Sequence, residues 1–114
     1  MSKRKPLLYL QDILTSLLRI EDYTRNLSFD DLNDDWKTID AVVRNLEILG
    51  EAARNMPEEL VEEYPDIPWS RMISMRNKVL HEYFGVDLEI LWKTIQEDLP
   101  FLRKQIKEML KEYT

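Results

Sequence analysis

The chain contains no cysteine, a single histidine and only two glycines among its 114 residues. Without cysteine there is no disulfide, no thiolate metal site and no cysteine nucleophile, which suits a cytoplasmic protein. One histidine without cysteines is also a poor transition-metal site, so we expect no bound metal. The scarcity of glycine and the abundance of Leu, Ile, Glu and Lys favour helix.

The sequence also lacks a long apolar run and an excess of basic charge. No stretch is long enough to span a bilayer, and Gln11 and Asp12 interrupt the start, which otherwise resembles a signal peptide. The formal net charge of −6 argues against passive binding of nucleic acid over a broad surface, but allows a small basic site. We therefore expect a cytoplasmic protein without membrane contact, with a single domain over residues 1–114.

Apolar residues recur at helical spacing and predict four long helices. The first covers about residues 6–26, and its broad apolar stripe hints at an oligomer. Residues 27–33 are expected to form a loop. Asp34 or Asp35 caps the second helix, which has Trp36 in its apolar stripe.

Three residues in the middle of the second helix are unusual for a plain amphipathic helix. Gly50 costs roughly 1 kcal/mol relative to alanine, for which a close approach by another helix would compensate. Glu47 and Glu51 lie one turn apart on one face. Either each is solvated or paired with a neighbouring arginine, or one of them faces inward and orients Arg76, with Glu51 as the candidate supporting residue.

An acidic helical turn at 57–63 and a connector with two prolines lead into the third helix. We expect Trp69 to anchor this helix, and Gly85 to end it somewhere between Tyr83 and Gly85 itself. Asp87 caps the fourth helix, which kinks or restarts at 98–100. No repeat and no convincing strand is found, so the predicted fold is all-α, an up-and-down four-helix bundle with one short extra helix.

The stretch from residue 70 to 87 holds the only histidine, His81, with Arg76 five residues before it and Tyr83 two after. This combination suits RNA cleavage, in which the 2′-hydroxyl attacks the adjacent phosphorus and the 5′-oxygen leaves. Histidine takes or gives a proton near neutral pH, and a fixed guanidinium stabilises the charge on the phosphoryl oxygens. No metal is needed for this reaction.

The spacing of these residues does not bring them together on a regular helix. Asn77 and His81 share a face, so the Asn77 amide would set the imidazole tautomer, whereas Arg76 lies roughly 140° away from His81. Either the helix distorts near His81, or a second copy of the chain completes the site in a two-fold dimer. Arg71 and Lys78 would make such a cleft basic and contact RNA phosphates.

The motif R-x(4)-H-x-Y is weak evidence by itself. A histidine near a helix end is often a capping residue, and the arginine and the tyrosine have ordinary roles as an ion-pair partner and a core aromatic. Longer segments occur in a fixed order, however: YLQDIL, AVVRNLEILGEAA, YPDIPW, MRNKVLHEYFGVD and LWKTIQEDLPFL. Over nearly the whole chain they resemble the HepT-like toxins of the HEPN superfamily, the ribonuclease partners in HEPN–nucleotidyltransferase toxin–antitoxin pairs.

The resemblance implies an all-helical homodimer, with the two motifs facing each other in a cleft, and metal-independent endoribonuclease activity. Carried over by position, Arg76 and His81 match the catalytic arginine and histidine, Asn77 the polar residue that follows the arginine, and Tyr83 the motif tyrosine. A separate minimal nucleotidyltransferase would be the antitoxin of this type VII-like system and would transfer AMP from ATP to Tyr83. ATP would then be a substrate of the partner, and this chain would need no cofactor.

Two other functions fit the same residues. The chain could be a non-catalytic helical dimer that binds a nucleotidyltransferase partner or a nucleotide, in which case the pure protein would not cleave RNA. It could also be a structural dimer whose motif residues form interface ion pairs, in which case mutation of the motif would unfold it.

Overall fold

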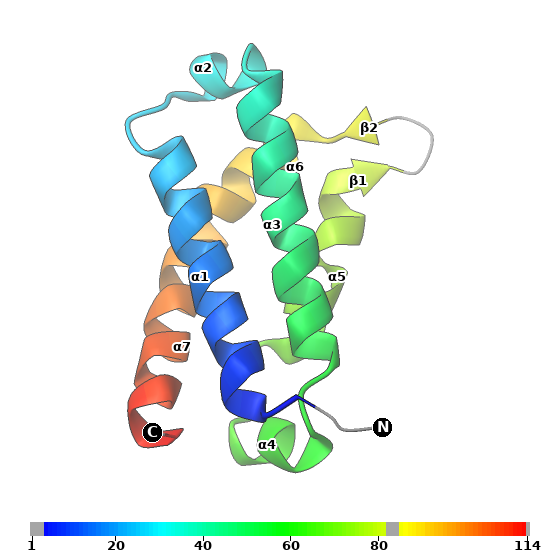
Figure 1. The fold of residues 1–114 in the computed structure, drawn as a ribbon. Helices are drawn as coiled ribbons and strands as arrows, with labels where there is room; N and C mark the ends of the chain where they lie inside the picture. The colour runs from blue at the N-terminus through cyan, green and yellow to red at the C-terminus, as the bar shows by residue number, and fades with distance from the viewer. Residues whose placement is uncertain (1–3, 82–84, 114) are drawn as a thin grey trace.

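The computed structural model describes residues 4–81 and 85–113, and for Arg76, Leu80 and His81 it describes the backbone alone. Four helical arms alternate in direction along the chain (Figure 1): α1 (Pro6–Thr24), α3 (Trp36–Arg54), α5 (Trp69–Val79), and a last arm of α6 (Leu88–Lys93), the π-helical turn η1 (Thr94–Asp98) and α7 (Leu99–Tyr113). Short helices α2 (Phe29–Asn33) and α4 (Glu58–Glu63) lie in the connections. The predicted all-α, up-and-down bundle is confirmed.

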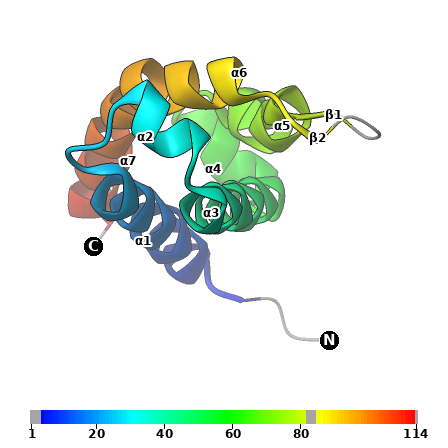
Figure 2. The ribbon, with the colours of Figure 1, turned by 90° about the horizontal axis from the view of Figure 1, so that it is seen from above.

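The helices surround one apolar core. Helix α1 packs between α3 and α7, α3 packs on α5, and α6 closes the side between α5 and α7, as the view from above shows (Figure 2). Each arm contributes its apolar stripe, and the largest fully buried side chains are Leu10, Ile13, Ile20, Leu32, Ile39, Leu46, Leu49, Met72, Leu91, Leu102, Ile106 and Met109. Because all four arms share this core, a shift of one arm is resisted by the others.

Two of the predicted helix caps are confirmed. The Asp35 carboxylate accepts hydrogen bonds from the backbone N–H of Thr38 (3.0 Å) and from its hydroxyl (2.6 Å). These hydrogen bonds stabilise the ionised carboxylate and lower the pKa of Asp35 below its ordinary value of 3.8. The Asp87 carboxylate likewise accepts from the backbone N–H of Ile90 at 3.1 Å and caps α6.

The prediction of a loop over residues 27–33 is wrong, since α2 lies within it. Ser28 and Asp31 form a capping box: the Ser28 hydroxyl accepts from the Asp31 N–H at 3.1 Å, and the Asp31 carboxylate accepts from the Ser28 N–H at 3.0 Å. The prediction for Trp36 is also wrong. This side chain is 57% exposed at the start of α3, beyond the part of the helix that packs on the core.

The last arm does not restart at 98–100 but continues through η1. The N–H of Leu99 donates to the carbonyl of Thr94, a π-helical hydrogen bond, and Pro100 has no N–H to offer to the preceding turn. Asp98 lies inside the π turn and not at the start of a new helix, and its carboxylate is 3.2 Å from the Arg71 guanidinium of α5.

Candidate active site

Helix α5, which carries Arg76, is anchored at its start by Trp69, as predicted. The indole is 6% exposed, and its Nε1–H donates to the backbone carbonyl of Tyr64 at 3.0 Å. This hydrogen bond ties the helix to the connector from Tyr64 to Pro68, whose two prolines restrict the backbone. The start of α5 is therefore fixed relative to α4.

The middle of α5 is placed by Gly50 of α3. A Cβ atom at Gly50 would lie 3.1 Å from the carbonyl oxygen of Met72 and 3.7 Å from that of Ile73. The predicted close approach of another helix is thus confirmed, and the approaching helix is α5. Because α3 and α5 run in opposite directions (Figure 1), this contact sets the register of the two helices.

Arg76 lies one turn beyond this contact, and its backbone position is on the same side of α5 as Met72 and Ile73. Moving one turn back from Gly50 on the antiparallel α3 leads to Glu47. The register therefore brings the backbone of Glu47 level with that of Arg76. Each step from Gly50 amounts to about 5 Å along its helix axis.

The prediction that the third helix continues to residues 83–85 is wrong, because α5 ends at Val79. His81 lies in β1 (Leu80–His81), which pairs antiparallel with β2 (Gly85–Val86), in the register Leu80 with Val86 and His81 with Gly85. The N–H of Asp87 donates to the carbonyl of Val79 at 2.6 Å and closes the hairpin against the helix end. Gly85 has a φ of 82°, a left-handed conformation that glycine adopts readily, but it lies in β2 and does not terminate the helix, which ends six residues earlier.

Since His81 is not part of the helix, Asn77 and His81 do not share a helical face, and the separation of roughly 140° between Arg76 and His81 does not apply. The sequence left open either a distortion of the helix near His81 or completion of the site by a second copy of the chain. Within the single chain the helix is interrupted before His81, as the first alternative expects. Completion of the site by a second copy stays a prediction. Tyr83 lies outside the described residues.

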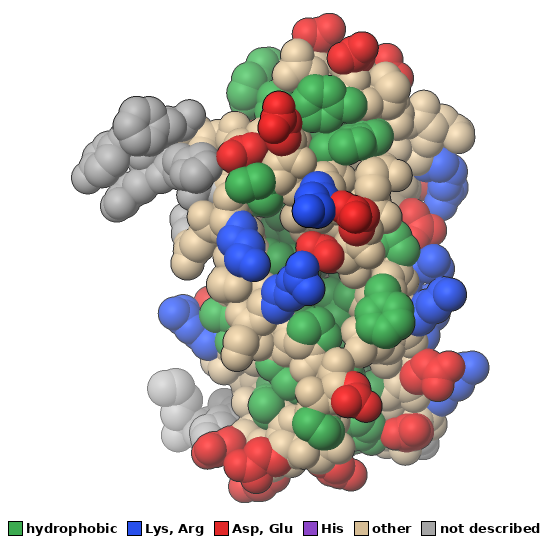
Figure 3. Space-filling model, turned by 180° about the vertical axis from the view of Figure 1, so that it is seen from behind, with side chains coloured by type: hydrophobic (Ala, Val, Ile, Leu, Met, Phe, Trp, Pro, Cys, Tyr) green, Lys and Arg blue, Asp and Glu red, His purple; other side chains and the backbone are tan. Residues whose placement is uncertain are grey.

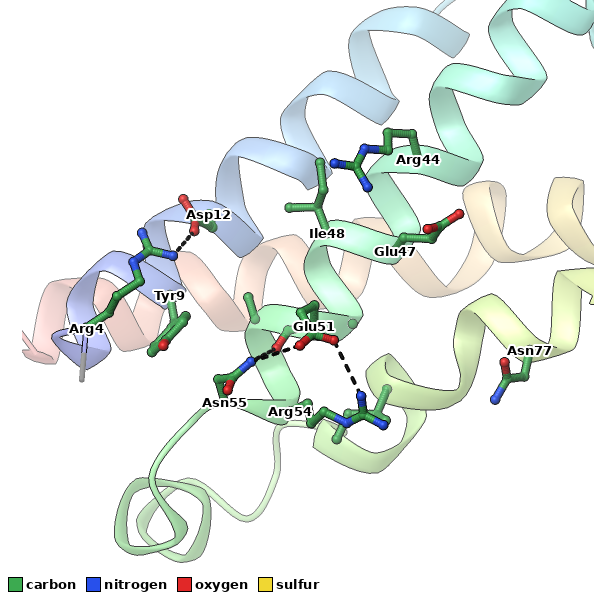
Figure 4. Close-up of a pocket in the computed structure, with 13 residues that line it drawn as sticks. Arg4, Tyr9, Asp12, Arg44, Glu47, Ile48, Glu51, Arg54, Asn55 and Asn77 are labelled. Atoms are coloured by element: carbon green, nitrogen blue, oxygen red, sulfur yellow. Dashed lines mark hydrogen bonds and ion pairs between the residues drawn. The ribbon is translucent and has the colours of Figure 1, made fainter. Parts of the chain in front are cut away.

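Asn77 faces a groove of ≈ 560 Å³ between the start of α1, the outer side of α3 and α5. Figure 4 shows its polar lining, in which the Arg4 guanidinium lies 2.8 Å from the Asp12 carboxylate. The charged residues at the groove come mainly from α1 and α3: Arg4, Asp12, Arg44, Glu47, Glu51 and Arg54. Charges of both signs therefore line the groove that Asn77 faces.

The two glutamates of α3 differ in their surroundings. The Glu51 side chain is 64% exposed and lies 3.5 Å from the Arg54 guanidinium, and it also accepts a hydrogen bond from the Asn55 amide at 3.3 Å. This is the solvated, arginine-paired arrangement, and not the inward one expected of a supporting residue. Glu47 is half-buried, and in Figure 4 its carboxylate points from α3 toward the side of the groove on which α5 lies.

Arg71 and Lys78 do not lie at this groove. Arg71 extends toward the last arm, where its guanidinium lies 3.2 Å from Asp98, and Lys78 is exposed. The back of the molecule, seen in Figure 3, shows Lys and Arg side chains interspersed with Asp and Glu. The local excess of positive charge expected from Arg71 is therefore offset by its acidic neighbour.

No three His, Cys, Asp or Glu side chains within residues 4–81 and 85–113 are grouped so that they could hold a metal ion. Among the helices of the same residues, none is both long and apolar enough to cross a bilayer.

Comparison with known proteins gives a consistent result. The "Probable ribonuclease HepT" of Thermococcus cleftensis is 46% identical over 103 residues, which cover 90% of this chain and 94% of that protein. The "Putative RNase MJ0127" of Methanocaldococcus jannaschii is 39% identical over 112 residues, covering 98% of this chain and 93% of that protein. The "Putative RNase TTE0752" of Caldanaerobacter subterraneus is 40% identical over 109 residues, covering 96% and 97%. No solved structure matches the chain significantly.

The family model described as "Ribonuclease HepT-like" matches residues 13–109. This match runs from the first turns of α1 to the last turns of α7 and includes the whole stretch from Arg76 to Gly85. The resemblance drawn from the ordered sequence segments is thereby confirmed. The chain belongs to the HepT-like ribonuclease family of the HEPN superfamily.

Proposed function

We propose that this protein is a metal-independent endoribonuclease and the toxin of a type VII-like toxin–antitoxin pair. The observation that carries this proposal is the match to HepT-like ribonucleases across residues 13–109, with Arg76 and His81 inside it. The backbone geometry supports it, because Arg76 lies in a helix and His81 in the strand that follows. The two residues are therefore not held apart by the periodicity of one helix.

In the proposed reaction, the 2′-hydroxyl of RNA attacks the adjacent phosphorus and the 5′-oxygen leaves. The products are a 2′,3′-cyclic phosphate and a 5′-hydroxyl. His81 transfers a proton at one of these two oxygens, and Arg76 stabilises the negative charge that develops on the phosphoryl oxygens. The function needs a homodimer in which the two motifs share a cleft, since an isologous pair doubles the cationic groups around one phosphate.

The proposed control is covalent. A nucleotidyltransferase antitoxin, encoded as a separate chain, transfers AMP from ATP to the Tyr83 hydroxyl and releases pyrophosphate. The adenylyl group adds a negative charge and a bulky base two residues from His81, where it competes with the substrate phosphate for Arg76. A Tyr83→Phe toxin should therefore escape neutralisation. Full neutralisation of that variant by the antitoxin and ATP would show that control is non-covalent.

The deciding experiment uses the purified full chain without its partner. Wild-type protein, His81→Ala and Arg76→Ala are each incubated with total RNA in excess EDTA, after mass spectrometry has shown that Tyr83 carries no AMP. We expect only the wild type to cleave RNA and leave 2′,3′-cyclic phosphate ends, while all three retain the same helical content and oligomeric state. A folded wild-type dimer that leaves the RNA intact would instead support a non-catalytic binding module.

A further inference from the structure

The groove beside α5 contains a carboxylate that the reaction as described does not use. Glu47 comes from α3, is half-buried, and lines the groove together with Asn77, the residue that follows Arg76. Long acidic side chains are seldom buried without a partner, because removing a charge from water is costly unless an opposite charge compensates. A partner for Glu47 is therefore expected on α5, toward which its carboxylate points (Figure 4).

The contact at Gly50 determines what lies opposite Glu47. Because a Cβ atom added at Gly50 would lie only 3.1 Å from the Met72 carbonyl oxygen, the backbones of α3 and α5 approach closely here. One turn from this contact, Glu47 on α3 and Arg76 on α5 occupy level positions on the facing sides of the two helices. The register of the two backbones therefore sets Glu47 opposite Arg76.

The neighbouring glutamate provides an internal comparison. Glu51 lies one turn further along α3, where it is exposed and paired with Arg54 of its own helix. Glu51 is level with the first turn of α5, and Arg76 lies more than one turn further along that helix. The register therefore distinguishes between two glutamates that the sequence alone does not.

On this basis we propose that Glu47 is the positioning residue for Arg76. Its carboxylate accepts hydrogen bonds from the guanidinium, holds it in one rotamer at the groove, and leaves its remaining N–H groups for the phosphoryl oxygens. Glu47 acts through Arg76 and does not touch the RNA. The inference rests on the proposed ribonuclease function for its catalytic consequence, but not for the contact itself.

The kinetic test compares Glu47→Gln with Glu51→Gln, two variants that remove the same charge from the same helix. Glu47→Gln should lower kcat by about 10- to 100-fold with little change in KM, because the guanidinium is no longer held in place. Glu51→Gln should lower kcat by no more than about twofold, and Glu47→Asp should recover part of the loss.

A second readout does not depend on catalysis. The side-chain Nε–H signal of Arg76 in a 15N NMR spectrum, assigned by its absence in Arg76→Lys, should shift and exchange faster with water in Glu47→Gln but not in Glu51→Gln. An unchanged signal in Glu47→Gln, or an equal effect of Glu47→Gln and Glu51→Gln on kcat, would overturn the proposal. If the wild type fails to cleave RNA while the signal still responds to Glu47→Gln, the ribonuclease function fails and the contact stands.

Discussion

The close approach of α3 and α5 at Gly50 allows a quantitative prediction. In an open helix, alanine in place of glycine stabilises a protein by about 1 kcal/mol. At Gly50 the added methyl group would lie 3.1 Å from the Met72 carbonyl oxygen, closer than carbon and oxygen atoms normally pack. That oxygen belongs to the backbone of a helix held at its start by Trp69, so it cannot move without displacing α5. Overpacking of this kind costs typically about 2 kcal/mol.

The two contributions have opposite signs, and we expect the steric one to be larger. Gly50→Ala should lower the free energy of unfolding by about 1 kcal/mol, equivalent to a fall in Tm of about 4 °C for a chain of this size. Gly50→Val, which adds branched methyl groups at the same contact, should cost about 3 kcal/mol. Displacement of α5 should also reduce RNA cleavage.

The assay is thermal and urea unfolding followed by far-ultraviolet circular dichroism. All variants must be compared at one protein concentration, since self-association makes Tm depend on it. Lys107→Ala, at an exposed position of α7, serves as the control for a substitution that meets no neighbour. If Gly50→Ala were more stable than the wild type by about 1 kcal/mol, as expected in an open helix, α3 and α5 would not be in tight contact at Gly50 and this contact would not set their register.

Two further predictions concern the ends of helices. Trp69→Phe removes the indole donor that binds the Tyr64 carbonyl and part of the buried ring, and should lower the free energy of unfolding by about 2 kcal/mol in urea titrations; an unchanged midpoint would show that the connector does not depend on this anchor. For Asp35, the hydrogen bonds from Thr38 lower the pKa in the folded state, so its stabilising effect is present above pH 3.8 and is lost as pH falls through the lower folded-state pKa. The difference in Tm between the wild type and Asp35→Asn should therefore shrink over that acidic range, and a constant difference would contradict the assignment.

The apolar periodicity predicts the bundle well because each long helix buries a stripe with regular spacing. The ends of the elements depend on contacts that periodicity does not contain. Helix α5 ends at Val79 because the following residues pair with Gly85 and Val86 across a turn, an interaction between segments that are not helical neighbours. The α2 helix had a local signal in Ser28-x-x-Asp31, whose aspartate is shorter than the usual glutamate of a capping box.

The sequence shows that the candidate-site residues Arg76 and His81 lie in one short stretch. It does not predict that they belong to two different elements, a helix and a strand. It also identifies Glu47 and Glu51 as equivalent neighbours, because helical spacing alone puts both on one face. The structure separates them through the contact at Gly50, which depends on a backbone carbonyl of another helix. Such a contact has no signature in the sequence beyond the glycine itself.

The π turn in the last arm has a consequence for how this chain tolerates changes in length. The buried residues Leu91, Ile95 and Leu99 are each four apart, which on an ideal α-helix would rotate the stripe by roughly 80° away from the core. The wider turn takes up this excess and returns the stripe of α7 to the core. Residues 94–98 therefore contain one residue more than a regular helix needs, and loss of one residue there would convert the turn to ordinary helix. A deletion between Glu47 and Gly50 in α3 would instead move Glu47 out of register with Arg76.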